Sequence, residues 1–167
     1  QKQRGLGNEV TVGRDGRLSS PALAAALIDG LVAGGAQVSD IGCGPTPMLY
    51  FASHELGSGG AIQVTGSHNP PTHNGFKMVM GGLSFFGADI EELGCISAAG
   101  PDRTDDGGVV SRAIEEAYVD RLAAGAVATG LSAIWDCGNG ASGPATEKLV
   151  ARLDGTVAWS ARWHWHT

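Results

Sequence analysis

The chain has 167 residues, of which 43% are hydrophobic and 17% charged, and its formal net charge is −6. A chain of this length can bury a substantial core, while its acidic balance argues against nucleic acid as a partner, because phosphate backbones attract basic surfaces. No apolar run is long enough to cross a membrane, so no membrane contact is expected. Three widely spaced cysteines provide neither a disulfide framework nor a Cys-x-x-Cys metal pair, which favours a cytoplasmic protein with reduced thiols.

Short apolar strands alternate with helices in the first part of the chain. In chain order, these strands and helices are predicted over 10–12, 20–33, 37–41, 46–56 and 61–64. Both helices begin near a proline, which suits the first helical turn. The alternation favours parallel strand pairing with right-handed crossovers. A strand over 76–80 follows a loop short enough for antiparallel pairing, and a helix is predicted over about 87–98.

The composition divides the chain into two α/β units, a linker and a tail. Residues 1–100 are expected to form the first unit, and 101–110, rich in Asp, Gly and Pro, to form the linker. Residues 111–155 are expected to be an incomplete second α/β domain, because one strand cannot make a sheet. Its helix, strand and helix are predicted over 111–124, 131–136 and 141–153. Residues 156–167 hold three of the four tryptophans and are interpreted as an anomalous tail without an assigned function.

The most informative stretch is 65–70, Thr-Gly-Ser-His-Asn-Pro, at the start of the loop that we call the serine loop (residues 65–75). Because a proline restricts the residue before it, Ser67 is expected on a stiff turn at the edge of the sheet. His68 is its neighbour, and Lys77 follows ten residues later. A hydroxyl, an imidazole and an ammonium group on one loop system favour phosphate chemistry. The alternative is that Ser67 and His68 only satisfy hydrogen bonds of the turn.

A second polar loop, 13–17, has the sequence Gly-Arg-Asp-Gly-Arg and follows the first strand. Arg14 and Arg17 are interpreted either as a clamp for an anion or as a brace for the serine loop, and the alternative is a solvated turn. If Ser67 is phosphorylated, it carries nearly two negative charges at neutral pH. Lys77 and Mg²⁺ are the natural groups to neutralise them, with His68 as a further donor.

A glycine-rich stretch over 138–143 matches G-x-G-x-x-G and lies between a predicted strand and a predicted helix. That is the context of a dinucleotide-binding turn. The acidic residue that such sites place about 20 residues further on is missing. A tight strand-to-helix turn is therefore favoured over a nucleotide site.

Five motifs occur in the order found in one enzyme family. With them the chain closely resembles the α-D-phosphohexomutases, in particular bacterial phosphomannomutase/phosphoglucomutase, from Glu9 to about Asp154. The motifs lie at 12–19, 44–47, 65–71, 74–77 and 136–140. The resemblance implies a three-layer α/β/α domain I with a mixed sheet, followed by an incomplete second α/β domain. The chain would then be an N-terminal fragment of a larger enzyme, for which a monomer is favoured.

The resemblance also implies a reaction and a site. In the family a phosphoserine, here Ser67, moves phosphate between the 1- and 6-positions of a hexose through a hexose 1,6-bisphosphate. Ser67, His68 and Lys77 would be catalytic, and Ser67 would bind Mg²⁺ through its phosphate. Contacts with the substrate or its phosphate are expected of Arg14, Arg17 and Asn69. The implied substrates are glucose or mannose 1- or 6-phosphate, with glucose 1,6-bisphosphate as activator.

Several family motifs do not occur in this sequence, among them the Asp-Gly-Asp-Gly-Asp-Arg loop that ligates Mg²⁺. Without its carboxylates the ion would have too few fixed oxygen ligands. Negligible mutase activity is therefore expected of this chain alone. Two alternatives stay open. One is a non-catalytic or degenerate module that binds sugar phosphates, and the other is a nucleotide-binding protein that uses residues 138–143.

Overall fold

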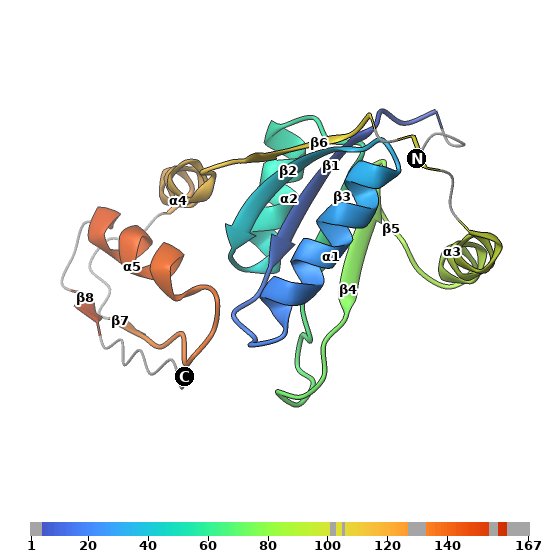
Figure 1. The fold of residues 1–167 in the computed structure, drawn as a ribbon. Coiled ribbons are helices and arrows are strands. Elements are labelled where there is room, and N and C mark those ends of the chain that lie inside the picture. Colours follow the sequence, from blue (N-terminus) through green and yellow to red (C-terminus); the bar gives the residue numbers. More distant parts are fainter. Residues whose placement is uncertain (1–4, 101–102, 105, 127–132, 154–156, 160–167) are drawn as a thin grey trace. The chain divides into compact units, whose positions relative to one another are not determined.

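The computed structural model describes residues 5–100, 103–104, 106–126, 133–153 and 157–159. The chain forms two compact units, Gln1–Arg112 and Ala113–Thr167. The first unit contains a six-stranded sheet and the second a two-stranded sheet (Figure 1). Within the ranges given, no helix combines the length and the apolar character that a membrane span requires.

The six-stranded sheet of the first unit is mixed. Its strands are β1 (Glu9–Arg14), β2 (Gln37–Cys43), β3 (Gly60–Val64), β4 (Phe76–Met80), β5 (Leu83–Ser84) and β6 (Gly108–Ser111). They lie side by side in the order β5-β4-β3-β1-β2-β6. β1 pairs parallel with β2 and β3, and β2 with β6, whereas β4 pairs antiparallel with β3 and β5. The predicted α/β fold with a mixed sheet is confirmed.

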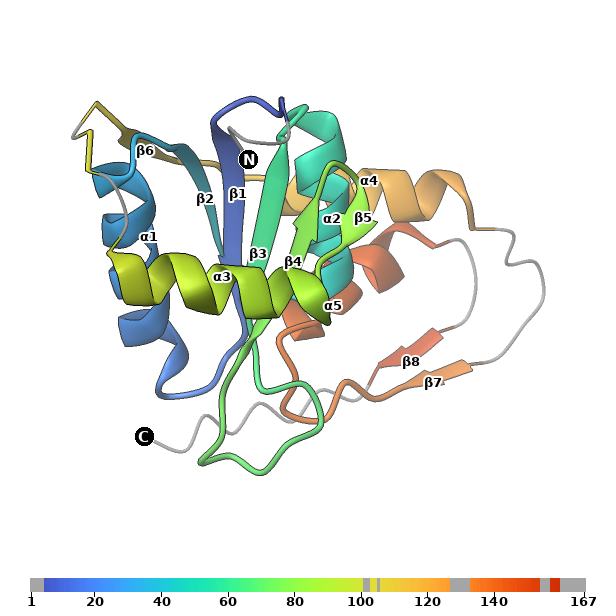
Figure 2. The ribbon, with the colours of Figure 1, turned by 90° about the vertical axis from the view of Figure 1, so that its right-hand side faces the viewer.

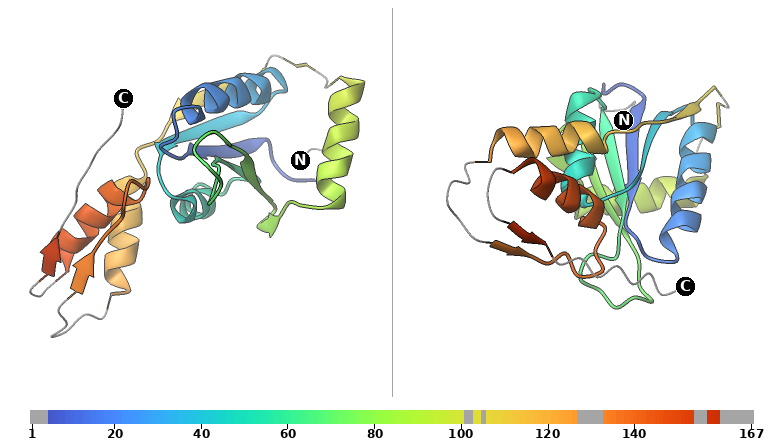
Figure 3. Two further views of the ribbon diagram at one scale, coloured as in Figure 1. Left: turned by 90° about the horizontal axis from the view of Figure 1, so that it is seen from below. Right: turned by 90° about the vertical axis from the view of Figure 1, so that its left-hand side faces the viewer.

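Helices cover both faces of this sheet. α1 (Ser20–Ala33) lies on one face and α2 (Thr46–Glu55) on the other, as the view from below in Figure 3 shows. Successive strand residues point to opposite faces, so alternate residues of β1 and β2 reach each helix. Residues buried on the α1 side are Val10, Val12, Ala36 and Val38. The fully buried side chains of α2 are Met48, Leu49 and Ala52.

The observed helices of the first unit lie close to their predicted bounds. α1 and α2 each have a proline in the first turn, where a missing backbone N–H does no harm. The third helix, α3 (Ala88–Ala99), follows β5, and acidic side chains at Asp89 and Glu91 suit the positive end of its dipole. None of the residues of α3 is buried.

Strand β6 was not predicted. Residues 108–110 were expected in the linker and a helix was expected from 111, but Gly108–Ser111 pairs parallel with Gln37–Asp40 of β2. Two features explain the strand. Val109 and Val110 are β-branched and favour extended backbone. Gly107 allows the chain to pass close to the end of α1, because a Cβ there would overlap the carbonyl oxygens of Val32 and Ala36.

The second unit contains α4 (Glu115–Ala124), β7 (Ala133–Trp135), α5 (Gly143–Arg152) and β8 (Val157–Trp159). α4 packs against α5, and two basic side chains of α5 form ion pairs with three acidic side chains of α4. β7 and β8 pair parallel. One strand was expected in this unit, and the second comes from the predicted tail over 156–167. The tail residues 160–167 lie outside the described residues.

Candidate functional site

The serine loop connects β3 to β4 beyond the carboxyl end of β3. Its base is closed by a hydrogen bond of 2.9 Å from the Thr65 N–H to the Gly75 carbonyl. The loop that connects β1 to α1 leaves the same end of the sheet, as Figure 2 shows. Parallel strands bring their carboxyl ends together, and ligand sites of α/β proteins form there. The two polar loops predicted from sequence are therefore neighbours.

Ser67 is exposed and has a left-handed backbone, with φ of 52°. Among the described residues, it is the one non-glycine residue with positive φ. Such a conformation costs on the order of 1–3 kcal/mol and persists only where the surrounding contacts impose it. Its own N–H donates to Thr65 Oγ1 at 3.0 Å, and the Asn69 N–H closes the turn on the Gly66 carbonyl at 2.9 Å. Neighbouring loop contacts thus hold the serine in a strained form.

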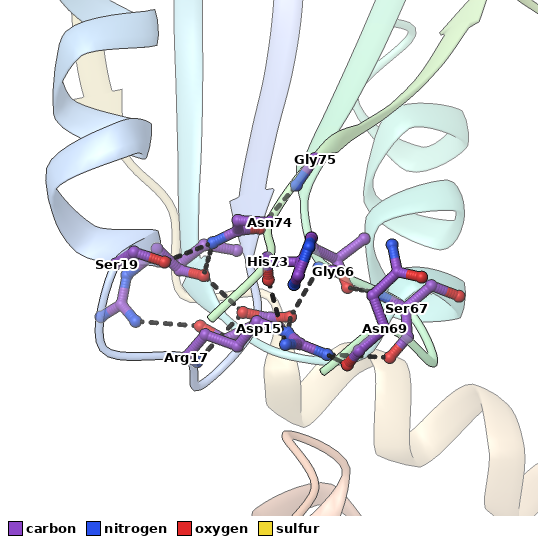
Figure 4. A network of polar contacts seen from close by, with 12 residues as sticks. Asp15, Arg17, Ser19, Gly66, Ser67, Asn69, His73, Asn74 and Gly75 are labelled. Atoms are coloured by element: carbon purple, nitrogen blue, oxygen red, sulfur yellow. Dashed lines mark hydrogen bonds and ion pairs between the residues drawn. The ribbon is translucent and has the colours of Figure 1, made fainter. Parts of the chain in front are cut away.

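Arg17 is the residue that fastens the serine loop (Figure 4). Its Nη2 donates to the carbonyl oxygens of Ser67 at 3.2 Å and Asn69 at 2.8 Å. Its Nη1 donates to those of Pro70 at 2.7 Å and His73 at 3.1 Å. Nε donates to Asp15 Oδ2 at 3.2 Å, so all five side-chain N–H groups of the arginine have an acceptor. Of the interpretations left open by the sequence, these contacts favour the brace.

Asp15 fixes the position of that guanidinium. Its carboxylate accepts hydrogen bonds from Ser20 Oγ at 2.5 Å, from the Arg17 N–H at 3.0 Å and from the Gly66 N–H at 3.3 Å. Partial burial alone would raise the pKa of Asp15. The hydrogen bonds from Ser20, Arg17, Thr65 and Gly66 together outweigh it and hold the pKa of this carboxyl below its ordinary value of 3.8. The carboxylate is therefore ionised at neutral pH.

Position 66 requires glycine for a packing reason. A Cβ on Gly66 would overlap Cζ and Nε of Arg17 and would lie 2.7 Å from the carbonyl oxygen of His73. The guanidinium therefore lies directly against the backbone of the loop, in space that any other residue would fill. The glycine before the serine and the arginine of the β1–α1 loop are parts of one arrangement.

The other predicted site residues lie around this arrangement and contact it less. His68 and Asn69 are exposed on the serine loop. Lys77 is exposed near the start of β4, directly opposite Gln63 in the antiparallel pair, at the end of the sheet from which the serine loop projects. Arg14 is the last residue of β1, and its Nη1 donates to the Asp15 carbonyl at 3.3 Å. The structure thus gathers all six predicted residues at one sheet edge.

Sequence reasoning did not assign a site role to Asp15 and Asn74, which are both parts of this network. Asn74 Nδ2 donates to Ser19 Oγ and to Ser20 Oγ, both at 2.9 Å, and its Oδ1 accepts from the Gly75 N–H at 2.9 Å. It ties the end of the serine loop to the start of α1. The available signals were the carboxylate between two arginines and the Asn-Gly pair, which is typical of turns.

The residues present do not form a magnesium site by themselves. In the described part of the chain, no group of three His, Cys, Asp or Glu side chains is arranged to hold a metal ion. Asp15, the carboxylate that contacts the serine loop, already accepts hydrogen bonds at both oxygens. A Mg²⁺ ion needs about six oxygen ligands, so its binding through Ser67 would need ligands from elsewhere.

The glycine-rich stretch over 138–143 forms a turn between β7 and α5. Gly138 has φ of 52°, and its N–H donates to Asp136 Oδ1 at 2.7 Å. The Gly140 N–H donates to the Cys137 carbonyl at 3.0 Å. These two N–H groups donate to acceptors within the turn, one of them the Asp136 carboxylate, so neither is left to bind a pyrophosphate. These contacts favour the tight turn over a nucleotide site.

The mixed sheet with helices on both faces makes this an α/β protein. Its candidate site is the loop that holds an exposed, strained serine at the carboxyl ends of parallel strands. Residues 1–99 match the family described as phosphoglucomutase/phosphomannomutase, alpha/beta/alpha domain I. The chain belongs to this family. The matched range contains all six predicted site residues and also Asp15, the partner of Arg17.

Similar proteins include bacterial phosphomannomutases and phosphoglucomutases. The chain is 40% identical over 153 residues to a phosphomannomutase/phosphoglucomutase of Pseudomonas aeruginosa, covering 89% of this chain and 32% of the relative. It is 38% identical over 151 residues to a phosphoglucomutase of Neisseria gonorrhoeae, covering 89% and 33%. A crystal structure of a family protein from Burkholderia thailandensis superposes with a TM-score of 0.86 at 38% identity, over 95% of this chain and 36% of the other. The chain thus spans about a third of the length of these relatives.

Proposed function

We propose that this chain supplies the phosphoryl-carrying serine of a hexose-phosphate mutase and that Ser67 is this serine. The observation that carries the proposal is the exposed, left-handed Ser67 on a loop fastened by Arg17. Membership of the family and the names of the relatives support it. The substrates would be the 1- and 6-phosphates of glucose or mannose, and the enzyme an intramolecular phosphotransferase.

The proposed step is a phosphoryl transfer from a hexose 1,6-bisphosphate. The Ser67 Oγ attacks phosphorus, so that an oxygen–phosphorus bond forms while the bond from phosphorus to the sugar oxygen breaks. The serine loses its proton, and the sugar oxygen gains one. Lys77 and His68 are proposed to move protons and to offset charge, since a phosphoserine carries nearly two negative charges. The reverse transfer to the other hydroxyl completes the exchange.

Phosphate contacts are proposed for Arg14 and Asn69, which lie at the same sheet edge as Ser67. Arg17 is left out of this group, because all its side-chain N–H groups are hydrogen-bonded within the protein. We also propose that the first unit, which β6 extends beyond the predicted boundary at residue 100, acts as domain I, and that the second unit is the beginning of a second domain. Turnover would then need the further residues that the longer relatives possess.

Phosphorylation of the chain tests this proposal directly. The chain, joined to the further residues that the longer relatives possess, is incubated with glucose 1,6-bisphosphate and Mg²⁺ and is then measured by intact-protein mass spectrometry and peptide mapping. We expect one phosphoryl group on Ser67. Ser67→Ala should abolish the label, and Ser97→Ala, an exposed serine of α3, should keep it. A label that persists in Ser67→Ala, or no label on the wild-type chain, would contradict the proposal.

A binding module without catalysis is the competing outcome. Calorimetry with glucose 6-phosphate and with mannose 6-phosphate measures binding separately from phosphorylation. Binding heat with no label on Ser67 would support the non-catalytic module. A label on Ser67 together with binding would support the mutase.

A further inference from the structure

We propose that Arg17 is a positioning residue whose guanidinium keeps Ser67 in the left-handed conformation that exposes it for phosphorylation. The role is distinct from phosphate binding. It depends on the proposed function in one respect, namely that Ser67 has to be accessible for phosphorylation. The geometry itself comes from the hydrogen bonds of the two loops (Figure 4).

Both peptide groups that flank Ser67 are tied. Its N–H is bound to Thr65 Oγ1 at 3.0 Å, and its carbonyl oxygen is bound to Arg17 Nη2 at 3.2 Å. A change of φ to the ordinary negative region would rotate one of these groups away from its partner. A strained conformation persists only where surrounding contacts impose it. Here the two hydrogen bonds to Thr65 and Arg17 impose it.

The guanidinium fork can fill this role because it is rigid. Its Nη2 binds the carbonyl oxygens on either side of His68, and its Nη1 binds those of Pro70 and His73. Four carbonyl oxygens of one loop thus converge on one planar group. Lysine keeps the charge but offers a single, flexible ammonium centre, which cannot reproduce this set of directions.

The fork is itself held on its other side. Asp15 Oδ2 accepts from Arg17 Nε at 3.2 Å and from the Gly66 N–H at 3.3 Å, so one oxygen fixes both the arginine and the loop. The side chains of Arg17 and Asp15 are only 17% and 18% exposed. Gly66 leaves the space in which the guanidinium lies. The position of the fork is therefore determined from three directions.

The test compares Arg17→Lys and Arg17→Ala with Arg121→Lys, a matched change at an exposed position of α4. The first measurement is independent of chemistry: backbone NMR shifts over 66–74 and amide exchange of Asn69 and His73. We expect shift changes confined to the serine loop and amide exchange faster by roughly tenfold or more, because the strained turn is no longer imposed. Arg121→Lys should change neither.

The second measurement is the rate at which glucose 1,6-bisphosphate labels Ser67. We expect a loss of roughly tenfold or more in both Arg17 variants, as the competent backbone becomes a minor state. Ethylguanidinium should restore labelling of Arg17→Ala, whereas ethylammonium should not. A purely structural loss would not separate these two additives.

The two proposals fail differently. No label on the wild-type chain would remove the proposed function, and the NMR measurement would still decide the role of Arg17. The positioning role would be overturned if Arg17→Lys left the NMR shifts of the serine loop unchanged. It would also be overturned if the wild type were labelled and the Arg17 variants were labelled at the same rate. Gly66→Ala is a second route to the same test, because its Cβ displaces the fork. Loss of folding in all these variants, with Arg121→Lys folded, would also overturn the proposal.

Discussion

The carboxylate of Asp15, at the end of β1, accepts a hydrogen bond from the backbone N–H of Gly66, which lies 51 residues further along the chain. The contact joins the two loops that leave the same end of the sheet. Since the same carboxylate also binds Ser20 and Arg17, it connects the start of α1 to the serine loop. Three predictions concern this arrangement, and a fourth concerns two glycines elsewhere in the first unit.

Replacing Asp15 with asparagine should destabilise the first unit by about 1–3 kcal/mol. The change keeps the shape but removes the charge that strengthens four hydrogen bonds, and its amide brings donors to sites that face other donors. Urea unfolding of the chain, followed by amide signals of β1 and β3, measures the effect. Asp29→Asn, at an exposed position of α1, is the control and should change stability by less than about 0.5 kcal/mol.

Stability should fall with acid in a way that depends on Asp15. Its pKa is lower in the folded chain than the ordinary 3.8, so the unfolded chain binds the proton more readily. The contribution of the carboxylate is therefore fully present well above pH 3.8 and is lost as the pH falls through the folded pKa. The difference in unfolding free energy between wild type and Asp15→Asn should shrink below about pH 4. A constant difference from pH 6 to pH 2 would contradict this expectation.

Ser67→Gly should give a more stable chain than Ser67→Ala. Glycine adopts positive φ without the steric strain that a Cβ introduces, which is worth about 1 kcal/mol. Both variants lack the hydroxyl, so the comparison isolates the backbone at φ of 52°. Thermal unfolding of the two variants provides the measurement. Equal midpoints would show that the left-handed form is not populated in solution.

Two glycine-to-alanine changes should have opposite signs. Gly107→Ala should be destabilising, because its Cβ would overlap the carbonyl oxygens of Val32 and Ala36 where the chain passes the end of α1 before β6. Gly94→Ala lies within α3, where a Cβ meets nothing within 4 Å, and should stabilise by up to about 1 kcal/mol. Unfolding midpoints of the two variants test the prediction. A tolerated Gly107→Ala would indicate that β6 does not pair with β2 as described.

The local pattern of the sequence predicted most of the first unit. Strand and helix periodicity located β1 to β4 and α1 to α3, and the short loop before Phe76 allowed the antiparallel pairing that the structure contains. β6 was missed because its valines follow a stretch of Asp, Gly and Pro, and a strand at a sheet edge is recognised only by its partner. Its partner, β2, lies about 70 residues earlier in the chain, beyond the reach of any local pattern.

The site was predicted in its residues but not in their division of labour. Local sequence located Ser67 on a stiff turn and left the role of Arg17 open between an anion clamp and a brace. The deciding contacts connect Arg17 to carbonyl oxygens more than 50 residues away, and backbone oxygens have no sequence signature. Asp15 was overlooked although it lies between two arginines, because its contact with the serine loop is made to the backbone N–H of Gly66, which has no sequence signature.

The hold of Arg17 on the serine loop also limits how the connection between β1 and α1 can vary in length. β1 fixes the position of residue 14, and α1 fixes the position of residue 20, so the turn between them has fixed ends. One inserted residue adds about 3.3 Å of chain, more than the tolerance of a hydrogen bond. A change in the length of this turn would therefore displace Arg17 and disturb the serine loop, although no residue of that loop is altered.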